Sequence, residues 1–130
     1  MEPLVLTATR GRLTLRMTCV GLGRDWSVTL SGGDRAHLGA VALAQARPSL
    51  EAEGGTSATT SVLALLGHKE DDLARTLAAE LAARLDAVVC VGCGIHLDGI
   101  TGEELAAVPE LTRDLTDRLL ARLSDPSGPP

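Results

Sequence analysis

Three histidines, His37, His68 and His96, are the residues of this sequence best suited to bind a ligand or a metal. Each lies close to glycine in a segment that joins two predicted elements, and glycine allows a backbone to approach a ligand closely. Neutral imidazole binds zinc, iron and manganese, so the three side chains would form a metal site if their turns meet. They match no local chelating motif, so an equally open interpretation is that each caps a turn or lies on the surface.

The segment 67–69 (Gly-His-Lys) has a second interpretation, because it precedes a predicted helix. Free backbone N–H groups at the start of a helix bind phosphate, and Lys69 would add positive charge. The glycines at 32 and 33, with Arg35 and Arg24, could supply another phosphate contact. The acids at 70–72 repel a bare phosphate unless a divalent cation bridges them, or they simply complement the helix dipole. These segments therefore indicate either a metal-bridged phosphate or no phosphate.

The positions of the cysteines favour a structural role over a redox or zinc-binding role. Cys90 and Cys93 have the C-x-x-C spacing of a redox pair or half a zinc site, but they continue an apolar strand. Residues three apart in a strand point to opposite faces, so only a sharp break at Gly92 would bring the two sulfurs together. Cys19 shares the apolar face of its predicted strand, and we expect it in the core.

Hydrophobic periodicity predicts the elements that position these residues. Alternating or β-branched runs predict strands at 4–9, 13–19, 26–30, 39–46 and 57–66, and a short apolar run predicts a sixth at 87–91. Leucines that repeat every four residues predict a helix from near Glu70. Thr101 and Glu104 fit a capping box, followed by a short turn and a second helix that starts at Pro109.

Five strands, a helix, a strand and a helix indicate an α+β fold. We expect a mostly antiparallel sheet of about six strands with two helices packed on one face. The length of 130 residues fits one domain, predicted at 1–123, with a flexible tail at 124–130 that is rich in Pro, Gly and Ser.

Composition excludes several classes of function. The chain has 12 Lys+Arg against 17 Asp+Glu, a net charge of −5, and no basic block, which argues against nucleic acid or anionic membrane as a partner. No apolar run approaches the ~20 residues of a membrane span. The first residues lack the layout of a signal peptide, and three cysteines do not make a disulfide framework. These observations predict a cytoplasmic protein.

Three segments taken together resemble the LpdD-like proteins, which accompany gallate-type decarboxylases of the UbiD family. They are Gly32-Gly33 with His37-Leu38-Gly39-Ala40, then Gly67-His68-Lys69-Glu70-Asp71, and Gly94-Ile95-His96-Leu97-Asp98 with Thr101 through Glu104. The resemblance covers roughly half of the chain, and its last segment is the most specific. A second resemblance, at the level of the fold, is to small proteasome-assembly chaperones.

The resemblance implies a non-catalytic chaperone of prenylated flavin mononucleotide (prenylated FMN). Such a protein would take the cofactor from a UbiX-type flavin prenyltransferase and deliver it to a UbiD-type, gallate- or hydroxybenzoate-like decarboxylase. The side chains implied to hold the cofactor's phosphate or a bridging divalent metal are His37, His68, Lys69, His96 and Asp98. The glycines implied to shape the loops are Gly32, Gly33, Gly67 and Gly94.

The residues alone leave other functions open. One is a small His-metal-dependent enzyme that acts on a phosphorylated or carboxylated small molecule, with Asp98 or Glu70 as the base. Another is an interaction subunit with no small ligand. A flavin ring would stack on Trp26, the single aromatic residue, or on an apolar wall of Leu and Ile. We also expect a homodimer, because the exposed edge of a small sheet often pairs with its copy.

Overall fold

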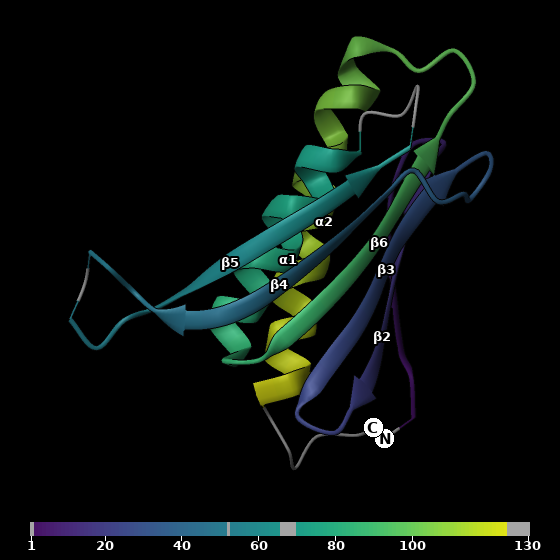
Figure 1. The fold of residues 1–130 in the computed structure, drawn as a ribbon. Coiled ribbons are helices and arrows are strands. Elements are labelled where there is room, and N and C mark those ends of the chain that lie inside the picture. The colour runs from purple at the N-terminus through teal and green to yellow at the C-terminus, as the bar shows by residue number, and fades with distance from the viewer. Residues whose placement is uncertain (1, 52, 66–69, 125–130) are drawn as a thin grey trace.

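The computed structural model describes residues 2–51, 53–65 and 70–124. Six strands and two helices follow one another along the chain (Figure 1): β1 (Leu4–Arg10), β2 (Leu13–Leu22), β3 (Asp25–Gly33), β4 (Ala40–Pro48), β5 (Thr56–Ala64), α1 (Asp71–Leu85), β6 (Val88–His96) and α2 (Gly102–Ser124). The predicted element order is therefore confirmed. The predicted tail at 124–130, apart from Ser124 at the end of α2, lies outside the described residues.

The strands form one six-stranded sheet in the order β1-β2-β3-β6-β4-β5. All neighbouring strands run antiparallel except β3 and β6, which run parallel. The last strand in the sequence therefore lies between two strands from the first half of the chain, as Figure 1 shows. The fold is α+β with a mostly antiparallel sheet, as the sequence predicts.

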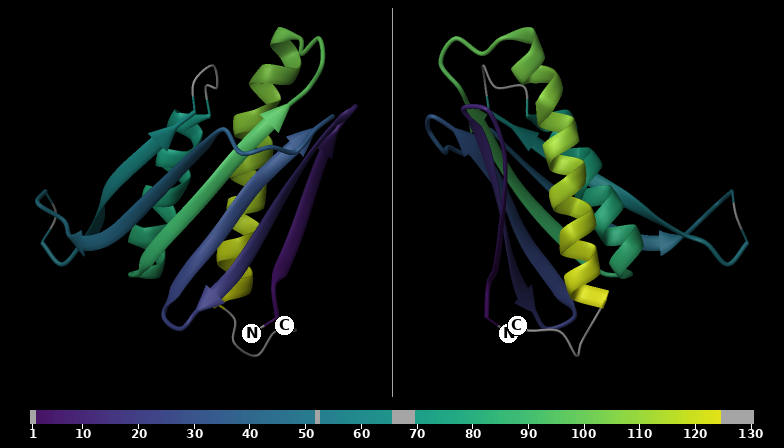
Figure 2. Two further views of the ribbon diagram at one scale, coloured as in Figure 1. Left: turned by 45° about the vertical axis from the view of Figure 1, so that its right-hand side comes forward. Right: turned by 180° about the vertical axis from the view of Figure 1, so that it is seen from behind.

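Both helices lie on the same face of the sheet (Figure 2). The residues of that face alternate with outward-facing ones because side chains along a strand point to opposite sides. Leu15 and Met17 of β2, Leu30 of β3 and Val91 of β6 are fully buried beneath the helices, together with Leu81 of α1. Because the chain has a single aromatic residue, leucine, valine and alanine fill this core.

The opposite face of the sheet, which we call the open face, carries the alternate residues of each strand. It includes Thr18, Thr29, Gly92, Val41 and Leu63, which the strand register places side by side. Thr29 and Leu63 are exposed, and Val41 is half-buried. The segments that carry His37 and His96 reach this face at the carboxyl ends of β3 and β6.

The second helix differs from the prediction. α2 is continuous from Gly102 to Ser124, so the expected turn before Pro109 is wrong and Pro109 lies inside the helix. Thr101 and Glu104 do form the predicted capping box, with each side chain accepting a backbone N–H of the other at 3.0–3.1 Å. The helix therefore begins at the box. Proline has no N–H to donate to the carbonyl of Leu105, and Leu105 is an exposed residue.

Most strands run further than their patterns predict, and two of these extensions build the candidate site. β3 extends to Gly33 and β6 to His96, and these two residues are partners in the parallel register. β6 has no break at Gly92, so Cys93 is buried while Cys90 lies half-buried on the open face. Both cysteines are free, as is Cys19, which is in the core as predicted. Burial raises the pKa of the Cys93 thiol to about 12 and that of Cys19 to about 11.

No helix among the described residues is both long enough and apolar enough to cross a membrane.

Candidate functional site

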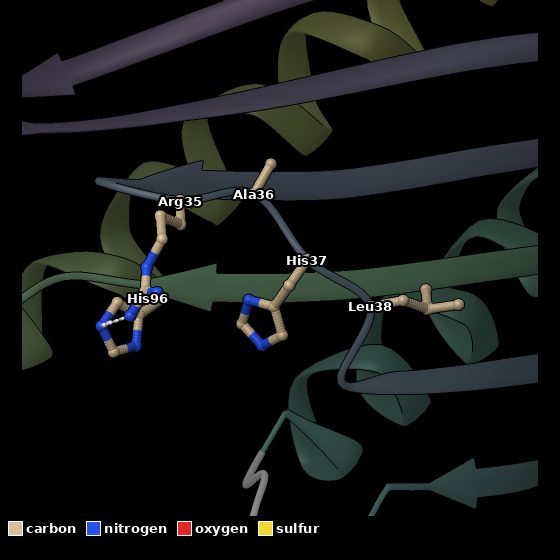
Figure 3. Close-up of a pocket in the computed structure, with 5 residues that line it drawn as sticks. All are labelled: Arg35, Ala36, His37, Leu38 and His96. Carbon is tan, nitrogen blue, oxygen red and sulfur yellow. Dashed lines mark hydrogen bonds between the residues drawn. The ribbon is translucent and has the colours of Figure 1, made fainter.

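The candidate site lies where β3 and β6 end. Because these two strands are parallel neighbours, their carboxyl ends meet at one edge of the sheet, and ligand sites often lie at such ends. The chain leaves β3 at Gly33, crosses over the end of β6 on the open face and enters β4 at Ala40 (Figure 3). This crossing segment, 34–39, carries His37, and the end of β6 carries His96.

Glycines allow the crossing segment to lie directly on the strands. A β carbon on Gly94 would overlap the backbone carbonyl of His37, and one on Gly33 would overlap the carbonyl of His96. Gly33 also has φ +80°, a left-handed conformation that favours glycine. The backbone N–H of Asp34 donates to the carbonyl of His96 at 2.6 Å. The two histidine-bearing segments are therefore held against each other by main-chain contacts.

A pocket of about 340 Å³ opens between these segments and is lined by Arg35, Ala36, His37, Leu38 and His96. The rings of His37 and His96 are 6.5 Å apart between centroids and nearly perpendicular. Nη2 of Arg35 lies 3.2 Å from Nε2 of His96, as Figure 3 shows. The pocket therefore gathers one guanidinium and two imidazoles, and Leu38 forms its apolar side.

Each imidazole also contacts a carboxylate. Oδ1 of Asp98 lies 2.7 Å from Nε2 of His96, and Oε1 of Glu70 lies 3.2 Å from Nε2 of His37. The hydrogen bond with His96 holds the pKa of Asp98 below its usual range, and the positive charges of His96, Arg35 and Arg12 add to this effect. Because both contacts involve Nε2 of His96, the tautomer of the ring decides whether this atom accepts from Arg35 or donates to Asp98.

The loop that carries Asp98 is fastened from two sides. Arg12, at the β1–β2 turn, donates through Nη2 to the carbonyls of Asp98 and Gly99 at 2.8 and 3.2 Å. The same guanidinium binds both carboxylate oxygens of Glu104 at 2.7 and 2.9 Å, which lowers the pKa of Glu104 from 4.5 to about 2. From the other side, Oδ2 of Asp34 accepts the backbone N–H of Asp98 at 2.8 Å. Asp98 is thus positioned before any ligand binds.

A family model for the prenylated flavin chaperone LpdD-like domain matches residues 9–124. The chain belongs to this family. The match includes every segment of the pocket, and it extends the resemblance seen in the sequence to nearly the whole chain. No curated protein has a significant match to the sequence.

This LpdD-like domain also has a fold in common with a solved structure. It is similar to a chain of the "Crystal Structure of a Novel Chaperone Complex for Yeast 20S Proteasome Assembly", with a TM-score of 0.59. The alignment covers 95% of this chain and 99% of that chain, at 17% sequence identity. At this identity the similarity concerns the fold, and it confirms the fold-level resemblance to proteasome-assembly chaperones.

The side chains of the LpdD-like pocket fit the anionic end of a mononucleotide. A guanidinium presents several N–H donors in a plane that suits phosphate, and the two imidazole rings lie beside it. The volume is at the small end of the range for ligand pockets, about 300–1,000 Å³, so a larger ligand would extend beyond it. No group of three or more His, Cys, Asp and Glu side chains that could hold a metal occurs within residues 2–51, 53–65 and 70–124.

The structure brings together some of the predicted site residues. His37, His96, Asp98 and Gly94 meet at the pocket, whereas Gly32 lies against the backbone of Thr14 on the neighbouring strand β2. Gly33 closes the contact between the two segments. The predicted residues Gly67, His68 and Lys69 lie outside the described residues, so their place in the site stays a prediction.

Other site residues were not recognised from the sequence. Arg12 and Asp34 fasten the loop of Asp98, although both are distant from it in the sequence. Leu38 supplies the apolar side of the pocket. Trp26, predicted as a stacking platform, instead packs against the core at the start of β3, the end opposite to the pocket. In the sequence, only the glycines next to Arg12, Asp34 and Leu38 indicate that the backbone at these positions approaches another segment.

Proposed function

We propose that this LpdD-like domain is a non-catalytic chaperone that binds prenylated FMN and delivers it to a UbiD-type decarboxylase. The observation that carries the proposal is the pocket of Arg35, His37 and His96 in a chain of the prenylated flavin chaperone family. The pocket offers several positively charged or donating groups to a phosphate, and it is built on segments held in place by close glycine contacts.

In the proposed complex, Arg35 binds the phosphate and the two imidazoles donate further hydrogen bonds. Asp98 and Glu70 contact the Nε2 atoms of His96 and His37 and so orient these imidazoles. His68 and Lys69, from the segment before α1, would complete the set as the sequence predicts. Leu38 offers an apolar contact to the part of the cofactor beyond the phosphate.

The exposure of the pocket supports a carrier rather than an enzyme. Arg35 and Asp98 are exposed, and His96 is 41% exposed. An enzyme that generates reactive intermediates usually excludes water from its site, whereas a carrier must release its ligand to a partner. We therefore propose that the cofactor comes from a UbiX-type flavin prenyltransferase and passes to a gallate- or hydroxybenzoate-like decarboxylase. We propose the cytoplasm as the place of this transfer and a homodimer as the working form.

A divalent metal is a further part of the proposal. It would bridge the phosphate to His37, His68 and His96, and it would offset the acids near the start of α1. Two of these imidazoles face the same pocket, and the third belongs to the segment outside the described residues. If instead the metal activated water, the protein would be the small metal-dependent enzyme that the residues alone leave open.

Anaerobic mixing with the product of a flavin prenyltransferase tests the proposal. We expect the protein to become coloured and to retain the cofactor through gel filtration, while His96→Ala retains much less. Elemental analysis of the loaded protein determines whether a metal accompanies the cofactor. Colourless wild-type protein after gel filtration would contradict the carrier, and turnover of a substrate that stops on chelation would favour the metal enzyme.

A further inference from the structure

The open face of the sheet carries a cluster of exposed apolar side chains on β4 and β5. We infer that through this face two copies of the chain pack sheet against sheet. Leu43 is 51% exposed and Leu63 is 79% exposed. Val41 pairs with Leu63 across the two strands, so the three side chains form one contiguous patch. Contiguous exposed apolar side chains of this kind mark interaction surfaces.

The patch continues towards the centre of the sheet. Leu38, which is 54% exposed, lies over Gly92 of β6, where an added β carbon would be 3.1 Å from its Cδ1. Gly92 is the register partner of Val41, so Leu38 adjoins the patch. Because Leu38 also lines the pocket, a chain packed on the open face would lie beside the candidate site.

Charge separates the open face from the helical side of the molecule. Among the described strand positions of the open face, the charged side chains are Arg16, Asp25 and Arg47. The remaining positions are mostly Thr, Ser, Val, Leu and Gly. The exposed side of α2, in contrast, carries ion pairs: Glu110 with Arg10, Asp114 with Arg118 and Asp117 with Arg113. Pairing through the open face leaves these charged groups in water, whereas pairing through α2 would remove them from it.

The size of the face matches what a stable dimer requires. Six strands of mostly nine residues at ~4.8 Å between strands and ~3.3 Å per residue give a face of roughly 850 Å². A stable interface buries about 800 Å² on each partner. Two such faces can pack about 10 Å apart as a sandwich with the helices outside.

A second copy suits this surface better than an unrelated protein. Transient complexes between different proteins use complementary charge to steer and select the partner. Stable homodimer interfaces are more apolar, and one two-fold axis makes a single patch its own partner. The open face offers mainly apolar and hydroxyl groups, which fits the second description. This inference concerns assembly and does not depend on the proposed cofactor function.

Leu43→Glu tests the inference. Leu43 lies on β4, whose backbone is paired with β6 on one side and β5 on the other, so its side chain reports on the face and not on an edge. Sedimentation velocity should show a wild-type dimer and a Leu43→Glu monomer, with dimerisation weakened about a hundredfold or more by the buried charge. Leu105→Glu is the matched control, because Leu105 is 61% exposed on α2. It should remain a dimer.

A substitution of the opposite charge checks that burial, and not the sign of the charge, causes the effect. Leu43→Lys should also be monomeric, because either charge would lose its hydration in the interface. Circular dichroism and melting curves check that each variant is folded. A monomeric wild type at tens of micromolar would overturn the inference. So would a Leu43→Glu or Leu43→Lys variant that stays dimeric, which would indicate edge-to-edge pairing.

Discussion

The two ends of β4 connect to loops of opposite character. The segment 34–39, before β4, lies on β6 through glycine contacts and is bonded to the β6–α2 loop through Asp34. The hairpin tip at 49–55, after β4, is closed by the backbone N–H of Ser49, which donates to the carbonyl of Gly55 at 2.8 Å. Its residue Leu50 is 90% exposed, and a β carbon on Gly54 would meet open space.

The difference shows that the chain fixes the backbone of the segment 34–39, where we propose that the cofactor binds, and not that of the hairpin tip. A loop that only joins two strands needs a turn and little else, as at the hairpin tip. The segment 34–39 is instead fixed by contacts to residues distant in the sequence, including His96 and Asp98. Such prior ordering lowers the entropy that a ligand must overcome on binding. We therefore expect substitutions near the segment 34–39 to have larger effects on stability and cofactor binding than substitutions at the hairpin tip.

The largest effect is expected from Gly94→Ala. The new β carbon would overlap the carbonyl of His37, so the crossing segment must move away from β6. We expect a loss of about 3 kcal/mol in the free energy of unfolding, the upper end for an overpacked site, together with loss of cofactor binding. Urea denaturation and cofactor titration measure the two effects.

Gly54→Ala is the control for this change. Gly54 has φ +76° and open space around it, so alanine there introduces backbone strain alone. We expect a cost of about 1 kcal/mol and unchanged binding. Equal effects of the two substitutions on binding would contradict the proposed difference between the loops.

Arg35→Ala is expected to have the next largest effect. Arg35 lines the pocket, and hydrogen bonds to charged groups contribute about 1.5–3 kcal/mol, so affinity for prenylated FMN should fall roughly 10- to 100-fold. Isothermal titration under anaerobic conditions measures this loss. Arg24→Ala removes an exposed arginine from the β2–β3 turn and should leave the affinity unchanged. An unchanged affinity of the Arg35 variant would contradict the proposal that the pocket binds the phosphate.

A smaller effect concerns the pH dependence of stability. Arg12 lowers the pKa of Glu104 from 4.5 to about 2 in the folded protein, so the ionised carboxylate stabilises the fold. This contribution is fully present above pH 4.5 and is lost as the pH falls from 4.5 towards 2. Glu104→Gln should therefore flatten the fall in unfolding free energy across this window.

Denaturant titrations at several pH values measure that slope. The control Glu53→Gln removes an exposed carboxylate from the hairpin tip and should keep the wild-type slope. If Glu104→Gln and Glu53→Gln gave the same slope, the bond between Arg12 and Glu104 would not stabilise the fold in solution.

The smallest effect is expected from Leu50→Ser at the hairpin tip. Because Leu50 is 90% exposed, its substitution should change the free energy of unfolding by less than about 0.5 kcal/mol. Cofactor affinity should also stay the same. Thermal melting and titration of the same sample check both expectations, and a lowered affinity would show that the tip contributes to binding.

The fold was predictable because its signals are local. Alternation in 13–19 and leucines spaced four apart in 73–85 identify strand and helix from neighbouring residues alone. The continuous α2 was missed because Pro109 usually starts or ends a helix, and the buried stripe of Val108, Leu111 and Leu115 outweighs its missing hydrogen bond. Tertiary packing therefore decides that the helix continues through Pro109, and the local sequence pattern does not predict this.

The site was only partly predictable. Glycine beside histidine led to the prediction of His37 and His96, and the structure places both at one pocket, where a close backbone approach requires the missing β carbon at Gly94. Arg12 was missed because its partners, including Asp98, are brought to it only by the sheet order. Residues that meet only through the sheet order follow no fixed spacing in the sequence, so the sequence pattern does not predict their contacts.

The central claim is that the pocket of Arg35, His37 and His96 holds the phosphate of the cofactor. The most direct test compares the affinity of the wild-type protein for prenylated FMN and for the same flavin without its phosphate. We predict that removing the phosphate weakens binding at least about tenfold, because each charge-assisted hydrogen bond contributes about 1.5 kcal/mol or more. Equal affinity for the two flavins would contradict the claim.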